Sequence, residues 1–517
     1  MLANRMRRVI ELAFVFALLS GCASIDYDYP RTESKALTDT NDTRLGQLLQ
    51  PIVTSKPDDQ SGFYTMINGI DALAVRLLLA ERAERSIDVQ YYLIKNDIVG
   101  RAFIYSLLRA ADRGVRIRLL VDDMFTAGMD VGVAALDSHP NFSIRIFNPF
   151  NRGALGRPLG AVTGFNRINR RMHNKSFTVD NQITIIGGRN IADEYFGARE
   201  DAKFGDLDVL GIGPVVQDIS NMFDTYWNHE TALPALAFVK ELDDPDAALA
   251  ELRTGLAETM DNIRDTEYAA AVNERFERYM DSDGSQLRWA PYEVVVDSPD
   301  KGIKKRAKEA ESITTPLIES LRSAESEALI ISPYFVPRKG GIEGFSALAA
   351  RGVDVTIVTN SLAANNQFTV HAGYGGSRKP LLKAGVDIWE VRPDADVQGA
   401  EIVAAVGAKA TLHTKAFIVD RREMFIGSFN FDPRSANINT ELGVIIRDPE
   451  LARSYAEWAE ETLPLGTYEV FLNEDNKLRW RDGREDPPIV FEKEPQSSWW
   501  DRTKVGIIKI FPIQSQL

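Results

Sequence analysis

The sequence predicts an α/β fold that contains one folding unit twice. The first observation is a strand–helix–strand order over residues 86–123, which indicates a parallel sheet with a right-handed crossover. The second is the return of that order over residues 328–361. The third is the spacing: Gly114 and Gly352 are 238 residues apart, and His173 and His413 are 240 apart. Two nearly equal offsets indicate an internal duplication, with copies of about 170 residues each.

Each element of the repeated unit is indicated by its residue pattern. Residues 86–94, "SIDVQYYLI", are β-branched and aromatic, as expected of a buried strand. Residues 100–114 have helical spacing and end on a glycine, which favours a helix C-terminus. Residues 115–123, "VRIRLLVDD", form the second strand of the unit. The second copy repeats the order in the segments 328–336, 341–352 and 353–361.

The first residues of the chain have the pattern of an export signal. Three arginines, at positions 5, 7 and 8, precede "LAFVFALL" (12–19), an apolar run too short to span a bilayer. Cys22 follows in "LSGC", and as the only cysteine it cannot form an internal disulfide. "LSGC" resembles the bacterial lipobox, in which the cysteine is lipidated; a cleaved signal with an incidental Cys22 is the alternative.

Composition and charge limit the classes of partner. Hydrophobic residues make up 44% of the chain and charged residues 26%, as in globular proteins. The formal net charge is −14, whereas nonspecific binding along nucleic acid needs a basic surface. We therefore expect no nucleic-acid partner.

The remaining segments define the expected organisation. Residues 234–283 are rich in Ala, Glu, Leu and Arg and predict a helical insertion, and "DKGIKKRAKEA" (300–310) is a solvated loop or a contact with anionic head groups. The polar residues up to about 60 predict a tether. The expected order is signal peptide (1–21), tether (22–60), first lobe (61–233), helical insertion and basic loop (234–312), second lobe (313–464) and C-terminal extension (465–517).

The candidate site is a motif that occurs once in each copy. "HNKSFTVDNQITIIGGRN" (173–190) and "HTKAFIVDRREMFIGSFN" (413–430) share the pattern H-x-K-x(4)-D-x(6)-G-[GS]-x-N. The His and the Lys are two residues apart and share one face of a strand. One H-x-K is common by chance, but two inside a duplicated framework are not.

Each motif is expected to fold as a hairpin with the turn near Asp180 in the first copy and near Asp420 in the second. Asp180 is roughly 23 Å from His173 along an extended strand, too far to orient the imidazole. A turn centred between residues 181 and 182 predicts the facing pairs His173 with Asn190, Lys175 with Gly188, His413 with Asn430, and Lys415 with Ser428.

The residue types at these positions suit a phosphate group better than a metal ion. Metal sites usually add carboxylates or further His at close spacing. Lys supplies a positive charge and Asn an amide donor for phosphate oxygens. Imidazole can act as nucleophile or general acid, so two histidines suit displacement at phosphorus and predict a bell-shaped pH profile. We expect no metal and no cofactor.

Each histidine needs a group that holds its tautomer. Asp206 and Glu441 stand at matching positions, eight residues before Pro214 and Pro449. They are therefore the candidate orienting acids, with Asp208 as the alternative in the first copy.

The two motifs resemble the signature of the phospholipase D superfamily, over residues 70–463. Segments such as "NRRMHNKSFTVD", "GGRNIADEYFGA" and "FIGSFNFDPRS" resemble its bacterial cardiolipin synthase C branch. The resemblance implies two α-β-α lobes with mixed sheets, related by a pseudo-twofold axis, with one active site at their interface. It also implies metal-free phosphatidyl transfer through a phosphohistidine.

By this resemblance the catalytic residues are His173, Lys175, Asp180, His413, Lys415 and Asp420, and the phosphate-binding residues are Asn190, Ser428 and Asn430. His173 is then the nucleophile and His413 the general acid, although the reverse is possible because the half-sites are nearly equivalent. Gly188 stands where the superfamily usually has Ser, which puts a hydroxyl contact in doubt for the first copy.

The expected activity is transfer of a phosphatidyl group to an alcohol on a second phospholipid, which gives cardiolipin. With water as the acceptor the product is phosphatidic acid. The expected partners are a membrane surface and phosphatidylglycerol, phosphatidylethanolamine or cardiolipin. A nuclease or phosphodiesterase of the superfamily and a non-enzymatic lipid-binding protein are the alternatives. Lipidation of Cys22 implies an anchor in the bacterial envelope, facing the periplasm and in the outer membrane.

Overall fold

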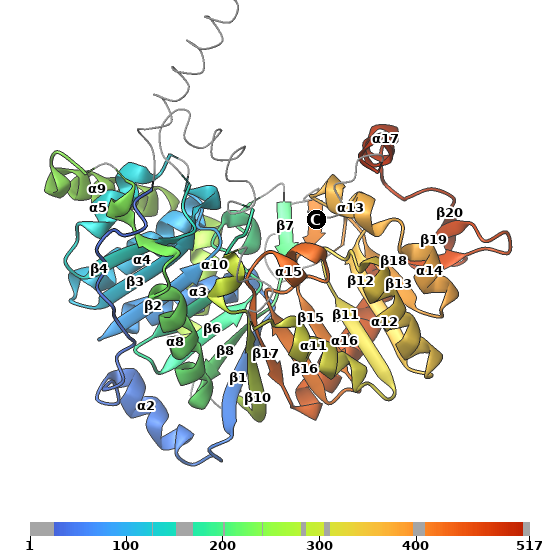
Figure 1. Ribbon diagram of the computed structural model, residues 1–517, viewed down its shortest axis with the longest axis horizontal. Coiled ribbons are helices and arrows are strands. Elements are labelled where there is room, and N and C mark those ends of the chain that lie inside the picture. Colours follow the sequence, from blue (N-terminus) through green and yellow to red (C-terminus); the bar gives the residue numbers. More distant parts are fainter. Residues whose placement is uncertain are drawn as a thin grey trace, which may run out of the picture.

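The computed structural model describes residues 25–126, 128–150, 169–199, 202–239, 241–280, 286–303, 311–395 and 409–509. The expected signal peptide and Cys22 lie outside these residues. Two α/β lobes stand side by side in Figure 1, the first in blue and green and the second in yellow to red. Within the described ranges, every helix is too short or too polar to cross a bilayer.

The first lobe is built on a mixed sheet. Its strands β2, β3 and β4 are parallel, whereas their neighbours run antiparallel. From one edge to the join with the second lobe the strands are β9 (Ala232–Pro234), β4 (Phe142–Phe147), β3 (Arg116–Asp122), β2 (Ser86–Tyr91), β5 (Ser176–Val179), β6 (Ile183–Gly187), β8 (Asp208–Ile212) and β1 (Gln60–Met66).

The second lobe repeats this order outward from the join, where β1 pairs antiparallel with β10. Its strands are β10 (Arg288–Val296), β17 (Leu442–Ile446), β16 (Glu423–Gly427), β15 (Ala416–Val419), β11 (Glu327–Ile331), β12 (Asp354–Asn360), β13 (Asp387–Val391), β18 (Thr467–Leu472), β19 (Leu478–Asp482) and β20 (Ile489–Phe491). Strands β11, β12 and β13 are parallel, as β2, β3 and β4 are. The matching order confirms the predicted α/β fold with two mixed sheets.

Helices lie on both faces of the sheets and divide the core into layers. The outer layers contain α3 (Gly69–Arg82), α4 (Ile98–Asp112) and α5 (Asp130–Asp137) in the first lobe, and α11 (Thr314–Arg322), α12 (Arg338–Ala350) and α14 (Arg378–Lys383) in the second. A shared inner core joins both sheets with α8 (Pro214–Trp227) and α16 (Pro449–Gly466). The remaining helices are α2 (Arg44–Val53), α9 (Pro245–Ile263), α10 (Glu267–Met280), α13 (Phe368–Tyr374), α15 (Pro433–Asn437) and α17 (Trp499–Ile508).

Two expected boundaries of the second lobe are wrong. Strand β10 falls inside the expected insertion (234–312), yet it pairs with β1 and β17 at the centre of the joined sheet. Strand β18 falls inside the expected C-terminal extension (465–517), yet it pairs with β13. Both segments, "RWAPYEVVV" and "TYEVFL", are rich in β-branched and aromatic residues, which favours strands.

The expected tether (22–60) is not a free linker over its described part. Leu45 and Leu49 of α2 are buried in the core of the first lobe, and the backbone N–H of Ala36 donates to the carboxylate of Asp224 (2.9 Å). The carbonyl of Ser34 accepts from the buried guanidinium of Arg118 (3.0 Å). This segment is ordered because it satisfies buried polar groups and covers apolar surface.

Candidate active site

The turn of each motif hairpin is centred half a residue earlier than expected. Val179 faces Ile183 in the first hairpin, and Val419 faces Glu423 in the second. Each loop has three residues, two of them with positive φ of 49–51°: Asp180 and Asn181, Asp420 and Arg421. The predicted facing pairs are therefore each wrong by one residue.

The motif aspartates hold backbone rather than touching the histidines. The carboxylate of Asp180 accepts from the N–H groups of residues 84–86, at 3.0, 2.7 and 2.9 Å. Asp420 does the same for residues 325–327. Each fastens the hairpin loop to the residues that lead into the neighbouring strand, β2 or β11, which favours a structural role; their catalytic assignment stays a prediction.

The two lobes meet at the candidate site through two short parallel β contacts. Strand β7 (Ala202–Gly205) of the first lobe pairs with β14 (Lys409–Leu412) of the second, and Figure 1 shows β7 at the join. The second contact is a parallel bridge between Met172 and Thr440. The residue after each paired strand is one of the candidate groups, so Asp206 comes beside His413, and Glu441 beside His173.

Each histidine is therefore bonded to the acid of the other lobe. Nδ1 of His173 lies 2.7 Å from Oε2 of Glu441, and Nδ1 of His413 lies 2.5 Å from Oδ2 of Asp206. All four side chains are buried. Burial by itself would raise the pKa of each carboxyl, but the neighbouring histidine and lysines hold both below their usual values. The carboxylates are thus ionised acceptors, Nδ1–H is the donor, and Nε2 of each ring is left as the reactive nitrogen.

The lysines bring positive charge to both histidines. Nζ of Lys175 donates to the carbonyl of His173 (2.5 Å), and Nζ of Lys415 donates to the carbonyl of His413. Lys415 Nζ also lies 2.8 Å from Nδ1 of His413, but that nitrogen gives its hydrogen to Asp206 and has no lone pair to accept.

Burial dominates the titration of these groups. It lowers the pKa of Lys175 to about 7 and that of Lys415 to about 8, against the opposing effect of nearby carboxylates. Burial likewise lowers the pKa of His173 to about 4 and that of His413 to about 3, and the lysines of both lobes act in the same direction. Each lysine lowers the pKa of the histidine in the other lobe as well as that in its own, so the two half-sites form one centre. Both imidazoles of this centre are neutral near pH 7.

The two carboxylates are held differently. Glu441 accepts from the hydroxyls of Ser428 (2.5 Å) and Ser435 (2.7 Å). Ser428, expected to bind phosphate, is therefore engaged in holding the carboxylate. In the first lobe the matching residue is Gly188, where a Cβ would collide with the carboxylate of Asp206. The carboxylate of Asp206 lies so close to the hairpin backbone that no side chain fits at position 188.

The predicted amides lie at the same centre. Oδ1 of Asn190 and Oδ1 of Asn430 are buried and have no hydrogen-bond partner within the described part of the chain. Nδ2 of Asn190 contacts the hydroxyl of Tyr195 (2.8 Å), which can serve as donor or acceptor. Rotating either side-chain amide by about 180° about χ2 exchanges the positions of its oxygen and its NH₂ group. Two buried amides, each with an oxygen that lacks a hydrogen-bond partner, can in this way offer an NH₂ group to the oxygens of an added phosphate.

Aromatic rings that the sequence did not single out surround the histidines. Tyr92 packs edge-on against His173 with ring centroids 5.1 Å apart. Tyr195 and Phe204 lie 4.9 and 5.6 Å from His413, and Tyr334 lies 6.4 Å from it. Tyr92 and Tyr334 follow the carboxyl ends of β2 and β11, the usual place for site residues in parallel sheets, and that position was the available signal.

Two polar residues at strand ends position the segment before each histidine. The carboxylate of Asp122, at the end of β3, accepts from the N–H of Met172 (2.9 Å). Asn360, at the end of β12, exchanges two hydrogen bonds of 2.9 Å with the backbone of Leu412. A polar residue at the carboxyl end of a parallel strand was the signal for both. Asp208, the alternative orienting acid, instead forms a buried ion pair with Arg76 (2.8 Å).

Within the described residues, no group of three or more His, Cys, Asp and Glu side chains is arranged to hold a metal ion. The donor set at this centre is two imidazoles, each already bonded to a carboxylate, with two ammonium groups beside them. The positive groups favour an anion.

Comparisons with known proteins place the chain among relatives of one family. A family model described as "Cardiolipin synthase, PLD-like domain" matches residues 78–227 and 317–463. Each matched segment contains one motif histidine and one orienting acid. The chain is 39% identical to cardiolipin synthase C of Escherichia coli over 482 residues, covering 91% of this chain and 99% of that protein. It is 24% identical to a cardiolipin synthase of Staphylococcus aureus over 370 residues, covering 71% of this chain and 60% of that protein.

The fold is also found in a solved structure. The phosphatidylserine synthase of Haemophilus influenzae superimposes with a TM-score of 0.57 at 13% sequence identity, over 88% of this chain and 95% of that one. At this identity the likeness concerns the fold alone.

Proposed function

Because the chain belongs to the family of phospholipase D-like cardiolipin synthases, and is a phosphatidyltransferase of that superfamily, we propose that it makes cardiolipin through a phosphohistidine. The observation that carries the proposal is the crossed pairing of His173 with Glu441 and of His413 with Asp206. It leaves two reactive Nε2 atoms in one buried centre that favours an anion.

In the first step, Nε2 of His173 attacks the phosphorus of a phosphatidyl donor. A P–N bond forms while the P–O bond to the leaving alcohol breaks, and His413 gives a proton from Nε2 to the leaving oxygen. Glu441 accepts from Nδ1–H throughout and stabilises the positive charge on the attacking ring. Lys175, Lys415 and the two amides hold the non-bridging oxygens.

In the second step, a hydroxyl on the acceptor phospholipid attacks the same phosphorus. His413 takes the hydroxyl proton, the new P–O bond forms and the P–N bond breaks, which restores His173. Water in place of the lipid alcohol gives phosphatidic acid. The roles of the two histidines are carried over from the family resemblance, and the exchanged assignment is the alternative.

The proton needed by the general acid arrives with the substrate. Both imidazoles are neutral in the empty site because burial lowers their pKa values to about 4 and about 3. A phosphodiester carries a negative charge and favours the charged form of a nearby imidazole, so its binding raises the pKa of His413. Substrate binding and proton uptake are therefore linked.

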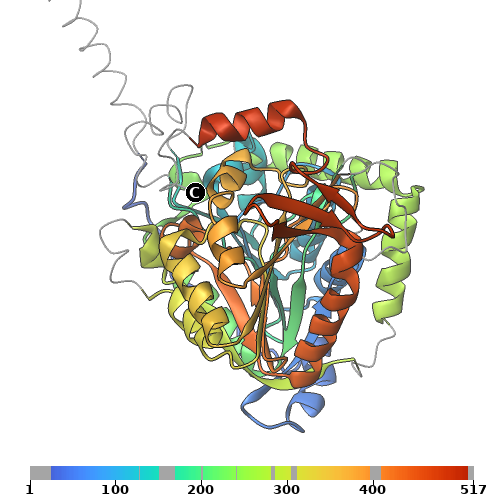
Figure 2. The ribbon, with the colours of Figure 1, turned by 90° about the vertical axis from the view of Figure 1, so that its right-hand side faces the viewer.

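The proposed substrates require access to a lipid surface, and α17 suits such contact. Its Trp499 and Trp500 are 62% and 65% exposed, whereas Val505 on the same helix is buried against α13. Lys504 provides a cation next to this apolar edge. Figure 2 shows α17 as the red helix along the top of the molecule, and Figure 1 places it toward the same edge as β7. Exposed Trp beside Lys is typical of helices that bind the membrane interface.

We further propose that Cys22 is lipidated after removal of residues 1–21 and anchors the enzyme in the outer membrane, facing the periplasm. Mass spectrometry of the membrane-extracted protein should find acyl groups on Cys22, and Cys22→Ser should abolish this acylation. An intact N-terminus in the wild-type protein would contradict the anchor.

Membrane contact by α17 is tested in the Cys22→Ser background. Replacing Trp499 and Trp500 by Ala should reduce co-sedimentation with phosphatidylglycerol vesicles about tenfold or more, because two interfacial anchors are lost. Trp458→Ala is the matched control, since Trp458 is 47% exposed but lies on α16. Equal losses in both variants would contradict the role of α17.

The activity is tested by incubating the purified protein with phosphatidylglycerol, with and without phosphatidylethanolamine. Cardiolipin as the product supports the proposal, and enzyme denatured at neutral pH during turnover should carry a phosphatidyl group on His173. Phosphatidic acid alone indicates water as the acceptor. Cleavage of DNA without lipid turnover would support the alternative, a nuclease of the superfamily.

A further inference from the structure

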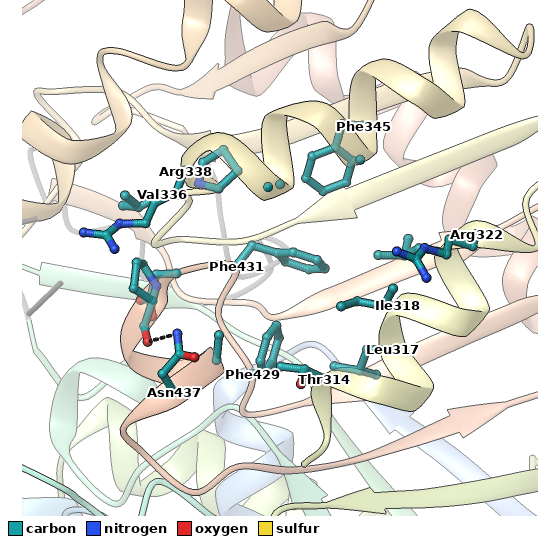
Figure 3. Close-up of a pocket in the computed structure, with 18 of the residues that line it drawn as sticks. Thr314, Leu317, Ile318, Arg322, Val336, Arg338, Phe345, Phe429, Phe431 and Asn437 are labelled. Atoms are coloured by element: carbon teal, nitrogen blue, oxygen red, sulfur yellow. Dashed lines mark hydrogen bonds between the residues drawn. The ribbon is translucent and has the colours of Figure 1, made fainter. Parts of the chain in front are cut away.

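An apolar pocket lies on the outer face of the second lobe, between α11, α12 and the segment that follows β16 (Figure 3). Its volume is about 370 Å³, within the range of small-molecule sites, about 300–1,000 Å³. The walls are aliphatic and aromatic, and include Leu317, Ile318, Phe345, Phe429 and Phe431. Charged side chains appear toward the ends, Arg338 at one and Arg322 at the other (Figure 3).

The matching face of the first lobe is covered by protein. There α3 and α4 correspond to α11 and α12, since each pair flanks the first parallel strand of its lobe. Helices α9 and α10 pack over them, with Val272 buried in the core and the hydroxyl of Tyr268 bonded to the carbonyl of Phe196 (3.0 Å). The spaces left beneath them are smaller, about 190 and 230 Å³. The second lobe thus exposes an apolar groove where the first lobe has two covering helices.

The pocket begins beside the candidate active site. Tyr334 packs against His413, and Val336, two residues later, lines the pocket. Two residues of chain span at most about 7 Å. A second segment makes the same connection, because Asn430 lies between Phe429 and Phe431, both of which line the pocket. Asp432, at this end of the pocket, is close enough to Lys415 to influence its titration.

Three glycines of α12 keep the groove open. Gly340, Gly341 and Gly344 all line the pocket. Gly is among the poorest helix formers, so three in one helix are costly unless the space they leave is used. A Cβ at Gly344 would meet no atom within 4 Å, so this position borders empty volume.

We propose that this pocket binds one acyl chain of the phospholipid whose phosphate occupies the centre between His173 and His413. The inference rests on the proposed function, because it names the part of that substrate that lies outside the catalytic centre. An acyl chain fits the apolar walls, and the short path from His413 matches the glycerol backbone that separates a phosphate from its acyl chains. A polar head group would find few partners along these walls.

The test replaces Gly344 by Leu, which places a large side chain at a pocket-lining position where a Cβ meets no atom within 4 Å. The ratio of kcat/KM for long-chain over short-chain phosphatidylglycerol should fall about tenfold or more in Gly344→Leu, since burial is worth about fourfold per methylene. Gly255→Leu is the matched control: Gly255 lies in a helix, its Cβ also meets no atom within 4 Å, and it does not line this pocket. A ratio that is equal in wild type and Gly344→Leu would overturn the proposal.

A binding experiment separates this inference from the proposed function. Alkyl phosphates from butyl to decyl, kept below their micelle concentrations, are titrated into wild type and Gly344→Leu by calorimetry. Affinity that rises with chain length in wild type and levels off in Gly344→Leu supports the pocket even if no transferase activity is found. Affinity that is independent of chain length in wild type overturns the pocket even if cardiolipin is made.

Discussion

The two half-sites have the same arrangement of residues, but each holds its orienting carboxylate in a different way. In each, a short parallel contact between the lobes brings a histidine beside an acid from the other lobe. In one the acid is Glu441, held by two serine hydroxyls; in the other it is Asp206, held close to Gly188. The length of the acidic side chain and the size of the hairpin residue that faces it are therefore coupled.

The outer faces of the lobes differ more widely. The first lobe covers its outer helices α3 and α4 with α9 and α10, whereas the second leaves the groove between α11 and α12 open. A duplicated fold can thus keep a symmetric centre and still present different surfaces on its two sides. The centre is built from both lobes, whereas each outer face is built from one lobe.

The largest expected effect comes from removing either histidine. His173→Ala and His413→Ala should each lower transfer from phosphatidylglycerol by about 10³-fold or more, because one loses the nucleophile and the other the proton donor. Product formation is measured by mass spectrometry of extracted lipids. Substantial activity in either variant would contradict a centre shared by both lobes.

A donor with a good leaving group distinguishes the roles of the two histidines. Phosphatidyl-p-nitrophenol needs little protonation of its leaving oxygen, so His413→Ala should still release a burst of nitrophenol while His173→Ala should not. The opposite result would exchange the two assignments.

The coupling between Gly188 and Asp206 predicts a rescue. Gly188→Ser alone should lower kcat by roughly 10²-fold, because the new side chain displaces the carboxylate that orients His413. Adding Asp206→Glu recreates the arrangement of the other half-site and should recover much of the loss. Ser428→Gly, which removes a hydroxyl without a clash, is the comparison variant. Additive losses in the double variant would show that the two positions are independent.

The pKa values of the two lysines predict how kcat/KM changes at high pH. Lys175 and Lys415 have pKa values of about 7 and about 8, and each is charged only below its pKa. Because substrate binding takes up a proton, kcat/KM should already fall with rising pH above about pH 4, and each lysine should add a further fall of up to about tenfold per pH unit as pH rises through 7–8. On the acid side it should fall below about pH 4, where His173 becomes protonated.

Lysine-to-arginine variants test which lysine causes the fall in kcat/KM at high pH. Arg stays charged in this range, so Lys175→Arg should remove the step near pH 7 and leave the one near pH 8. Lys415→Arg should do the reverse. An unchanged alkaline limb in both variants would assign it to another group.

The smallest effect on chemistry is expected from the motif aspartates. Asp180→Ala leaves three N–H groups without their acceptor, of which that of Ser86 is buried, and should lower the free energy of unfolding by about 1–3 kcal/mol. Asp420→Ala should cost less, because Asp420 is more exposed and water can replace it. Thermal unfolding measures both, and kcat per folded molecule should stay within a few-fold of wild type. A loss of kcat as large as that in the histidine variants would instead support a catalytic role for the aspartates.

Much of the site could be predicted because its signals are local. His173 and Lys175 are two residues apart, and their repetition at His413 and Lys415 marked the centre. The hairpin register was missed by one residue, because the turn depends on left-handed loop residues and on hydrogen bonds to another strand. Tyr92 and Tyr334 were missed because an aromatic residue at a strand end resembles core packing in sequence.

The sequence by itself determined the duplication, the residue types of the centre and the candidate orienting acids, since periodicity and motif spacing depend only on chain order. Which acid holds which histidine was decided only by the tertiary structure, through β7 with β14 and the bridge between Met172 and Thr440. The same is true of the covered and open outer faces. Contacts between residues more than 200 positions apart depend on how two sheets dock, and no local pattern in the chain encodes that docking.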